Sequence, residues 1–406
     1  MSRNGNPNDG PLSGIQILDC TIWQNGPYAS VLLSDMGAEV IKIEQRETGD
    51  PGRGMVERIP RGDISTYFEA MNRNKRSITL DLKKDEGREI FYKMAEKADV
   101  VVQNFRVGVA ERIGIDYDSL VKVNPKIICA SATGFGRKGP EATNGVFDIL
   151  GTARGGAMRA LQYPDSELVY SGGFGMADQT GAMVLAHAIT MALLARERFG
   201  EGQDVEISQL GAQLLLQHMG ITRYLITGAS VPPARRNEVF NPLFSVYECE
   251  GSNWIALACL QADRHWKDIC EVLELGELER DPKFAEMTER NANGKELVPL
   301  LDRAFASKSR EFWLEALVAR RVPCSPVNDY SDLASDVQVQ ANEYIVDMEH
   351  PDVGTIQEVG VPIQMSKTPG RVRHTAPELG QHTEEVLLEY GFDWDQIQKF
   401  REVAVI

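Results

Sequence analysis

Strand-like and helix-like segments alternate through the first third of the chain, and this alternation limits the possible folds more than any other feature. Short apolar runs typical of strands are separated by longer runs with helical periodicity. Strands are expected at 15–21, 39–44, 77–82, 100–105 and 126–133, and helices at 28–36, 85–97 and 109–121. This order predicts an α/β domain with an open, mostly parallel sheet and helices on both faces.

Polar and basic residues gather where the predicted strands begin or end. They are Gln24 to Pro27, Gln45 and Arg46, Asn74 to Arg76, Asn104 to Arg106, and Arg112 in the next helix. Ligands of open parallel sheets bind beyond the carboxyl ends of the strands. Each residue taken alone fits a solvated surface charge, but the set predicts a site for a ligand rich in phosphate.

A glycine-rich stretch at 171–181 leads into a long apolar run at 182–195. The run has the length and composition of a buried helix, and it places Asp178 at or near the helix N-terminus. The free amides and the helix dipole stabilise an anion there. Asp178 is therefore either a simple N-cap or a reactive carboxylate beside a loop that lacks side chains.

Residues 134–139 spell GxGxxG directly after a predicted strand. A dinucleotide fingerprint has to open a helix after the first strand, whereas this motif follows the fifth. Proline, threonine, asparagine and glycine come next, at 140–145, and this composition is typical of a loop. We expect no nicotinamide cofactor.

Composition restricts the partners and the compartment. The 406 residues carry a net charge of -16, which disfavours a surface for nucleic acid. No stretch has the length or character of a membrane span or a signal peptide. The six cysteines form no CxxC pair and the six histidines lack ligand spacing, so we expect free thiols, no metal and a cytoplasmic location.

The second half of the chain changes in character. A sixth strand is expected at 205–208 and an apolar helix at 210–225, and a proline-rich boundary follows at 232–236. A hairpin at 243–249 and 254–260 and helices near 263–274, 281–291, 296–306 and 309–319 predict a smaller α+β domain. Residues 323–375 are expected to be irregular, with a final helix at 377–389. The predicted domains are 1–225, 226–330 and a linker with C-terminal segment at 331–406.

Several motifs resemble those of the class III CoA-transferases, the family of formyl-CoA:oxalate and carnitine CoA-transferases. They are Gln24-x-Gly26-Pro27, Gly37 to Glu44, Asn74 to Ser77, Asn104-Phe105, Arg112 to Gly114, and Ala376 to Leu387. They occur in order along nearly the whole chain. The resemblance implies a Rossmann-like large domain that the C-terminal segment completes, a small domain, and an interlocked homodimer.

The resemblance also implies the chemistry. Asp178 would attack the thioester of an acyl-CoA, forming an anhydride and then an aspartyl-CoA thioester, and a small carboxylic acid would accept the CoA. Gln24 would lie at the active site. The residues implied to hold coenzyme A are Arg46, Lys75, Asn104, Phe105 and Arg112.

One departure and two alternatives stay open. The segment at 256–263 lacks the glycine run of formyl-CoA transferases, which leaves the acids unidentified. An acyl-CoA racemase of the same superfamily would carry a histidine where this chain has Phe147, beside Asp148. We expect Asp148 to orient substrate or support Asp178, or only to cap a loop. A CoA-binding protein without activity would need no carboxylate at position 178.

Overall fold

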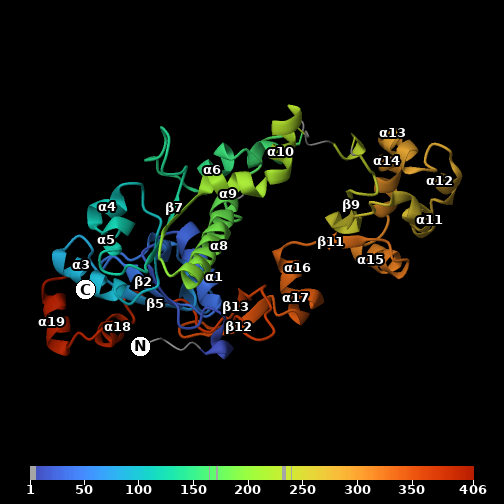
Figure 1. Cartoon of the computed structure of the whole chain (residues 1–406). Helices are drawn as coiled ribbons and strands as arrows, with labels where there is room; N and C mark the ends of the chain where they lie inside the picture. Colours follow the sequence, from blue (N-terminus) through green and yellow to red (C-terminus); the bar gives the residue numbers. More distant parts are fainter. Residues whose placement is uncertain (1–5, 164, 171, 231–234, 239) are drawn as a thin grey trace. The chain divides into compact units, whose positions relative to one another are not determined.

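The computed structural model describes residues 6–163, 165–170, 172–230, 235–238 and 240–406 (Figure 1). The chain forms two compact units. The larger contains Met1–Arg159, Tyr170–Ser230 and Ala341–Ile406, and the smaller contains Ala160–Val169 and Val231–Gln340. The chain therefore passes from the larger unit into the smaller one twice and returns to the larger unit each time.

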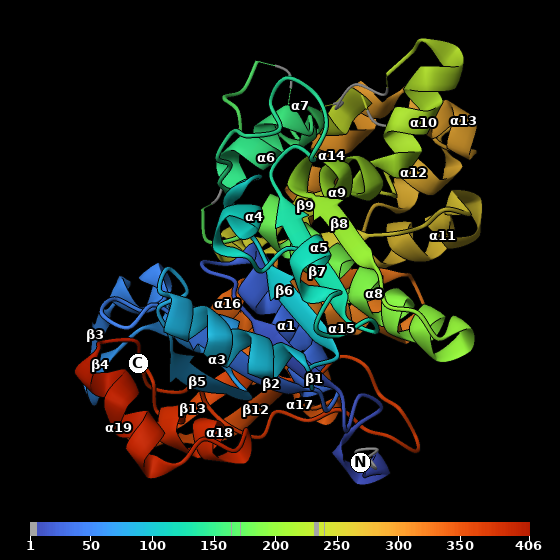
Figure 2. The ribbon, with the colours of Figure 1, turned by 60° about the vertical axis from the view of Figure 1, so that its left-hand side comes forward.

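A six-stranded parallel sheet forms the centre of the larger unit, as the alternating sequence predicts (Figure 2). Its strands lie in the order β5-β2-β1-β6-β7-β8, and every neighbouring pair is parallel. The bounds are β1 Gln16–Asp19, β2 Glu39–Glu44, β5 Lys75–Thr79, β6 Val100–Gln103, β7 Ile128–Thr133 and β8 Asp204–Ser208.

The strand order reverses next to β1. The chain places β2 and β5 on one side of β1, and then β6, β7 and β8 on the other. Connections that leave β1 and β6 in opposite directions open a crevice outside their carboxyl ends, where ligands of such sheets bind. The topology alone therefore marks the loops after β1 and β6 as a candidate site.

The larger unit contains helices as well as the sheet. They are α1 Asn25–Asp35, α2 Thr66–Asn72, α3 Asp85–Ala95, α4 Val109–Ile113, α5 Tyr117–Leu120, α6 Asp148–Arg154, α7 Ala157–Ala160, α8 Met176–Phe199, α9 Gln209–Leu216, α10 His218–Thr227, α18 Thr383–Glu389 and α19 Trp394–Glu402. The single helix predicted at 109–121 is wrong. It is divided into α4 and α5 at Gly114, which has a φ of 75° and cannot continue a right-handed helix. Across the described residues, we find no helix with both the length and the apolar character needed to cross a bilayer.

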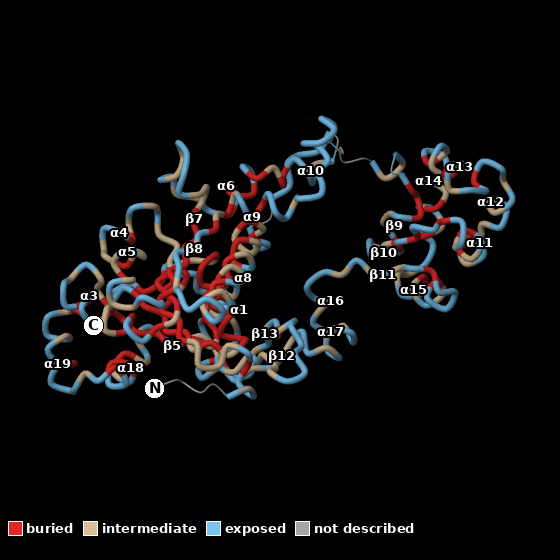
Figure 3. The backbone as a smooth tube through the Cα atoms, viewed as in Figure 1, coloured by how far each residue is buried: buried red, intermediate tan, exposed pale blue. Residues whose placement is uncertain are grey.

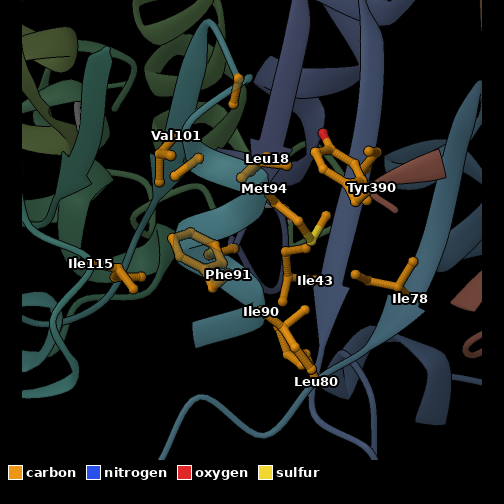
Figure 4. Packing of buried hydrophobic residues seen from close by; sticks show 14 of the residues in the cluster. Leu18, Ile43, Ile78, Leu80, Ile90, Phe91, Met94, Val101, Ile115 and Tyr390 are labelled. Carbon is orange, nitrogen blue, oxygen red and sulfur yellow. The ribbon is translucent and has the colours of Figure 1, made fainter. Parts of the chain in front are cut away.

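The apolar core of the larger unit lies on both faces of the sheet. On one face, α3 packs Ile90, Phe91 and Met94 against the strands, and Tyr390 from the C-terminal segment joins them (Figure 4). On the other face, α1 and α8 cover the sheet. The C-terminal segment thus contributes core residues to a sheet built from the first half of the chain.

The region 323–375 is more regular than we predicted. It contains β11 Cys324–Val327, α16 Tyr330–Ser335, α17 Val337–Ala341, β12 Ile345–His350 and β13 Gly354–Val359. The last two pair as an antiparallel hairpin. Their alternating half-exposed residues give a weak strand signal, because few of these side chains are buried. The short strands β3 Glu57–Ile59 and β4 Gly62–Ile64, a second hairpin, are likewise absent from the prediction.

The smaller unit has its own core (Figure 3). A three-stranded antiparallel sheet of β9 Val246–Glu248, β10 Trp254–Leu257 and β11 lies in the order β11-β10-β9, and it confirms the predicted hairpin. Helices α11 Ala262–Val272, α12 Gly276–Arg280, α13 Met287–Ala292, α14 Gly294–Phe305 and α15 Arg310–Ala319 surround it.

Candidate active site

Helix α8 begins directly after the glycine-rich stretch, so that Asp178 lies in its first turn. Gly175 precedes the helix with a φ of 56°. A Cβ atom at this position would lie 2.3 Å from Nε2 of Gln24, so a side chain would displace the Gln24 amide. The turn therefore needs glycine both for its backbone conformation and for the close approach of Gln24. Ser171, the first residue of the predicted turn, lies outside the described residues.

Asp148, rather than Asp178, caps the start of α8. Oδ1 of Asp148 accepts hydrogen bonds from the backbone N–H of Ala177 at 2.6 Å and of Asp178 at 2.9 Å. Asp148 is only 7% exposed and is the first residue of α6. Asp178 is the third residue of α8 and does not cap it, and its carboxylate instead accepts a hydrogen bond from Gln209.

The electrostatic surroundings of Asp178 differ from our expectation. We expected the helix N-terminus to favour its ionised form. Burial, together with the negative charge of Asp148, instead raises the pKa of Asp178 to about 7, although a hydrogen bond from Gln209 opposes the shift. Burial is the larger cause, and the carboxylate of Asp148 adds to it by lying beside Asp178 at the helix end.

The loop between β1 and α1 packs against the first turns of α8. Asn25 donates its Nδ2 hydrogen to the backbone oxygen of Asp178 at 3.4 Å, and it occupies the space left by Gly181. Asn104, after β6, fixes the same loop: its amide accepts from Ile22 N at 3.0 Å and donates to Ile22 O at 2.7 Å. The predicted site residues Gln24 and Asn104 are therefore brought together.

A cavity of about 330 Å³ opens at this point. It is lined by the loop after β1, the loop after β6, the end of β7 and the side chains of Asp178 and Gln209. Gln24, Asn104 and Phe105 also line it. The cavity thus lies at the crevice that the reversed strand order predicts, and Asp178 faces it.

A second cavity of about 840 Å³ shares Ile22, Phe105 and Val109 with the first. Its basic lining residues are Arg46, Lys83, Lys84, Arg88 and Arg112. Arg46 and Arg112 were predicted for this role. The other three were missed, although their position just after β5, at its carboxyl end, is a signal that could have identified them.

Lys75 occupies a different place from the one we predicted. Its ammonium group is fully buried and donates to Asp19 Oδ2 at 2.9 Å, and to two backbone oxygens and the Asn72 side chain. Burial alone raises the pKa of Asp19, but the ammonium groups of Lys75 and Lys42 outweigh it and lower the pKa to about 2. All three ammonium hydrogens have partners within the protein, so the structure favours a structural role for Lys75 over phosphate binding.

Aromatic side chains near Asp178 were also missed. Trp23 has a φ of 65°, and its backbone N–H donates to Asp50 at 3.1 Å. Its ring meets Tyr67 and Phe147 edge-on, with centroids 6.4 and 6.1 Å away. Trp23 and Phe147 line the small cavity together with Asp178. Burial and the nearby charge of Asp178 raise the pKa of Tyr67. A positive φ at tryptophan is not visible in the sequence.

The sequence and the fold resemble those of a known protein family. Residues 12–383 match the family described as CoA-transferase family III. The chain belongs to this family. Several relatives are themselves named CoA-transferases, so the protein is an enzyme of this class, and the resemblance inferred from its motifs is confirmed.

Relatives and solved structures match this family III CoA-transferase along most of its length. The succinate–glutarate CoA-transferase of Agrobacterium fabrum is 34% identical over 385 residues, which cover 93% of this chain and 95% of that protein. The acetyl-CoA:oxalate CoA-transferase of Acetobacter aceti is 33% identical over 357 residues, covering 88% and 90%. The crystal structure of a CAIB/BAIF family protein from Brucella suis matches with a TM-score of 0.85 and 29% identity, covering 94% of this chain and 100% of that one.

The raised pKa of Asp178 predicts a stability change in this CoA-transferase. In the folded state Asp178 ionises near pH 7, whereas in the unfolded chain it ionises near its ordinary value of 3.8. Its ionisation therefore destabilises the fold increasingly as the pH rises between these values. We expect Asp178→Asn to raise the melting temperature by about 2–6 °C at pH 8 and by less at pH 4.5.

Thermal unfolding followed by circular dichroism measures this difference. Asp118→Asn, at an exposed aspartate of α5, is the control and should change the melting temperature little at either pH. An equal gain for Asp178→Asn at both pH values would contradict a raised pKa.

Proposed function

We propose that this enzyme moves CoA from an acyl-CoA donor to a free carboxylic acid through covalent intermediates on Asp178. One observation carries the proposal: Asp178 faces a small cavity that adjoins a larger cavity with five basic residues, including Arg46 and Arg112, among its lining. The thioester would reach the carboxylate in the first cavity, while Arg46 and Arg112 in the second hold the phosphates of CoA.

The first step forms an anhydride. A carboxylate oxygen of Asp178 attacks the thioester carbonyl carbon, so that a C–O bond forms and the C–S bond breaks as the CoA thiolate leaves. The attacking group has to be ionised. Because its pKa lies near 7, a useful fraction of Asp178 is ionised at neutral pH.

The remaining steps exchange the acids. The thiolate attacks Cγ of Asp178, which releases the donor acid and leaves an aspartyl-CoA thioester. The acceptor carboxylate then attacks the same carbon and expels the thiolate, giving a second anhydride. The thiolate finally attacks the acceptor's acyl carbon and restores the Asp178 carboxylate. No oxidant, reductant or water is consumed, and each step is a carbonyl substitution.

Gln24 is proposed to assist at the reacting carbonyl. Its side chain lines the small cavity and packs against Gly175, next to the first turn of α8. An amide N–H in this position is suited to stabilise the oxyanion of a tetrahedral intermediate. Asn104 is proposed to act indirectly, by holding the β1–α1 loop in place, because both of its amide hydrogen bonds go to the backbone of that loop.

The acceptor is proposed to be a small carboxylic acid. Relatives of this chain are named for oxalate, for succinate and glutarate, and for mesaconate. The cavity beside Asp178 has a volume of about 330 Å³, which suits a small acid rather than a long acyl chain.

The covalent mechanism predicts an acyl-enzyme. Wild-type protein incubated with acetyl-, succinyl- or formyl-CoA should gain the mass of an acyl group or of CoA, because the intermediates are covalent. Hydroxylamine should convert the activated Asp178 to a hydroxamate. Asp178→Asn should lose at least about 1,000-fold in transfer rate, because an amide is a poor nucleophile. Intact mass spectrometry with peptide mapping measures both effects.

Two outcomes would decide against this mechanism. Transfer retained by Asp178→Asn, or a modified residue other than Asp178, would refute the assigned nucleophile. The alternative of a CoA-binding protein without activity predicts CoA binding with neither adduct nor turnover. The racemase alternative predicts exchange of the α-proton in deuterated water without transfer, but the relatives named above are transferases and Phe147 has no titratable group.

Arg112 gives a second prediction. It is exposed, lines the larger cavity and makes no ion pair with any residue that the structure describes. Losing one phosphate contact should raise the KM for acyl-CoA about 10-fold in Arg112→Gln and leave kcat within about twofold. Arg58→Gln, at an exposed arginine of β3 that does not line this cavity, is the control. Steady-state kinetics with an unchanged KM in Arg112→Gln would remove Arg112 from the proposed CoA site.

We also propose that the protein forms a homodimer. Helix α10 has no buried residue in the single chain, and Met219, Leu225 and Ile226 are 86%, 75% and 78% exposed. Leu215 and Leu216 of α9, the helix that precedes α10, are also more than half exposed, and exposed apolar residues at this density are typical of an interface. Sedimentation equilibrium at micromolar concentration should return a mass near twice 45.1 kDa, and Ile226→Glu should weaken the dimer. A single-chain mass for the wild type would refute this proposal.

A further inference from the structure

Helix α9 and the residue that ends it present three glutamines to their neighbours at a spacing of four residues. Gln213 donates to the backbone oxygen of Met176 at 3.2 Å, and Gln217 donates to that of Gly155 at 2.8 Å. Gln209, one turn earlier than Gln213, donates its Nε2 hydrogen to Oδ1 of Asp178. Only the first of the three therefore contacts the candidate nucleophile itself, whereas the other two bind backbone.

Gly151 of α6 and Gly155, the residue that follows this helix, make room for the three glutamines. A Cβ atom at Gly151 would lie 2.6 Å from Oε1 of Gln209, and one at Gly155 would lie 2.4 Å from Cβ of Gln213. Gly151 and Gly155 are four residues apart, and Gly155 still has helical backbone angles, so they lie on the same side of this segment. The absence of side chains there lets α9 approach closely enough for Gln209 to reach Asp178.

Gln209 is held in a buried position beside the cavity. It is 6% exposed, and it lines the cavity together with Asp178. Its Oε1 atom is buried and has no hydrogen-bond partner among the described residues. A buried, unpaired carbonyl oxygen is costly, and Gln213 carries one as well, so the hydrogen bond to Asp178 is what distinguishes Gln209 from it.

We propose that Gln209 is a positioning residue for the transfer reaction, which fixes Oδ1 of Asp178 by a hydrogen bond and leaves Oδ2 to attack the thioester. The inference rests on the proposed role of Asp178. A carboxylate with both oxygens free rotates between equivalent orientations, whereas a donor on Oδ1 restrains that rotation. The hydrogen bond also favours the ionised form of Asp178, which is the form that attacks.

An amide suits both protonation states of Asp178. With its N–H toward Asp178 the amide donates a hydrogen bond to the carboxylate, and with the amide rotated by half a turn its oxygen accepts a hydrogen bond from the O–H of the carboxylic acid. The unpaired Oε1 has no other described partner that would oppose such a rotation. Neither a hydrocarbon nor a charged side chain of similar size serves both states.

The test compares two glutamines on the same helix. Gln209→Met keeps the length of the side chain but removes the hydrogen bond. We expect its rate of acyl-enzyme formation to fall about 10- to 100-fold, with the KM for acyl-CoA within about twofold. The acidic limb of its pH profile should move to higher pH, because the hydrogen bond that lowers the pKa of Asp178 is lost.

Gln213→Met is the matched control, because Gln213 is fully buried but binds only backbone. It is expected to lower stability while keeping the acylation rate of the folded enzyme within about threefold and the pH profile unchanged. Rapid-quench mass spectrometry measures acylation, and circular dichroism confirms folding. If Gln209→Met does not fold, Gln209→Asn, which is one methylene shorter, should show the same loss.

A wild-type rate and pH profile in a folded Gln209 variant would overturn the inference, and so would an equal loss in Gln213→Met. These outcomes differ from failure of the proposed function. If Asp178→Asn transfers CoA and the wild type forms no acyl-enzyme, the role of Asp178 is wrong and the inference for Gln209 falls with it. If the wild type is acylated at Asp178 and Gln209→Met behaves like it, only the role of Gln209 is wrong.

Discussion

The capping of α8 by Asp148 is the interaction on which the arrangement of the site depends. It joins the start of α6 to the first turn of α8 through two hydrogen bonds from Ala177 and Asp178. The cap fixes the helix end, and its negative charge acts on Asp178 at the same time. One buried carboxylate thus helps to determine both the position of the second and its raised pKa.

Behind the site, a buried network of charges holds the loop after β1. Lys42 donates to Thr21 O and to Asp50, each at 2.9 Å, and Lys75 pairs with Asp19 at the end of β1. These charges are almost fully buried, so removing one partner would leave the other unpaired in the core, at a cost of about 3–5 kcal/mol. The network gives the β1–α1 loop a rigid base from which Gln24 and Asn25 reach α8.

Much of the fold could be predicted from the sequence, because apolar periodicity records which residues face the core. All six strands of the sheet and the helix that carries Asp178 were predicted. The hairpin β12–β13 was missed, since its side chains are half exposed and leave little pattern. The break at Gly114 was missed as well, because a positive φ becomes visible only once the chain is folded.

The sequence by itself determined the order of the sheet strands along the chain and the family, and through the family it indicated the candidate nucleophile, because these follow from runs of neighbouring residues. Only the tertiary structure decided which polar side chains meet. The ammonium group of Lys75 is buried in the core, because Asp19 and three other acceptors surround it there. Gln209 contacts Asp178, which lies 31 residues earlier in the sequence, because Gly151 has no side chain and lets α9 pack close to α6. Such contacts depend on distances between separate elements, and no local pattern of residues encodes those distances.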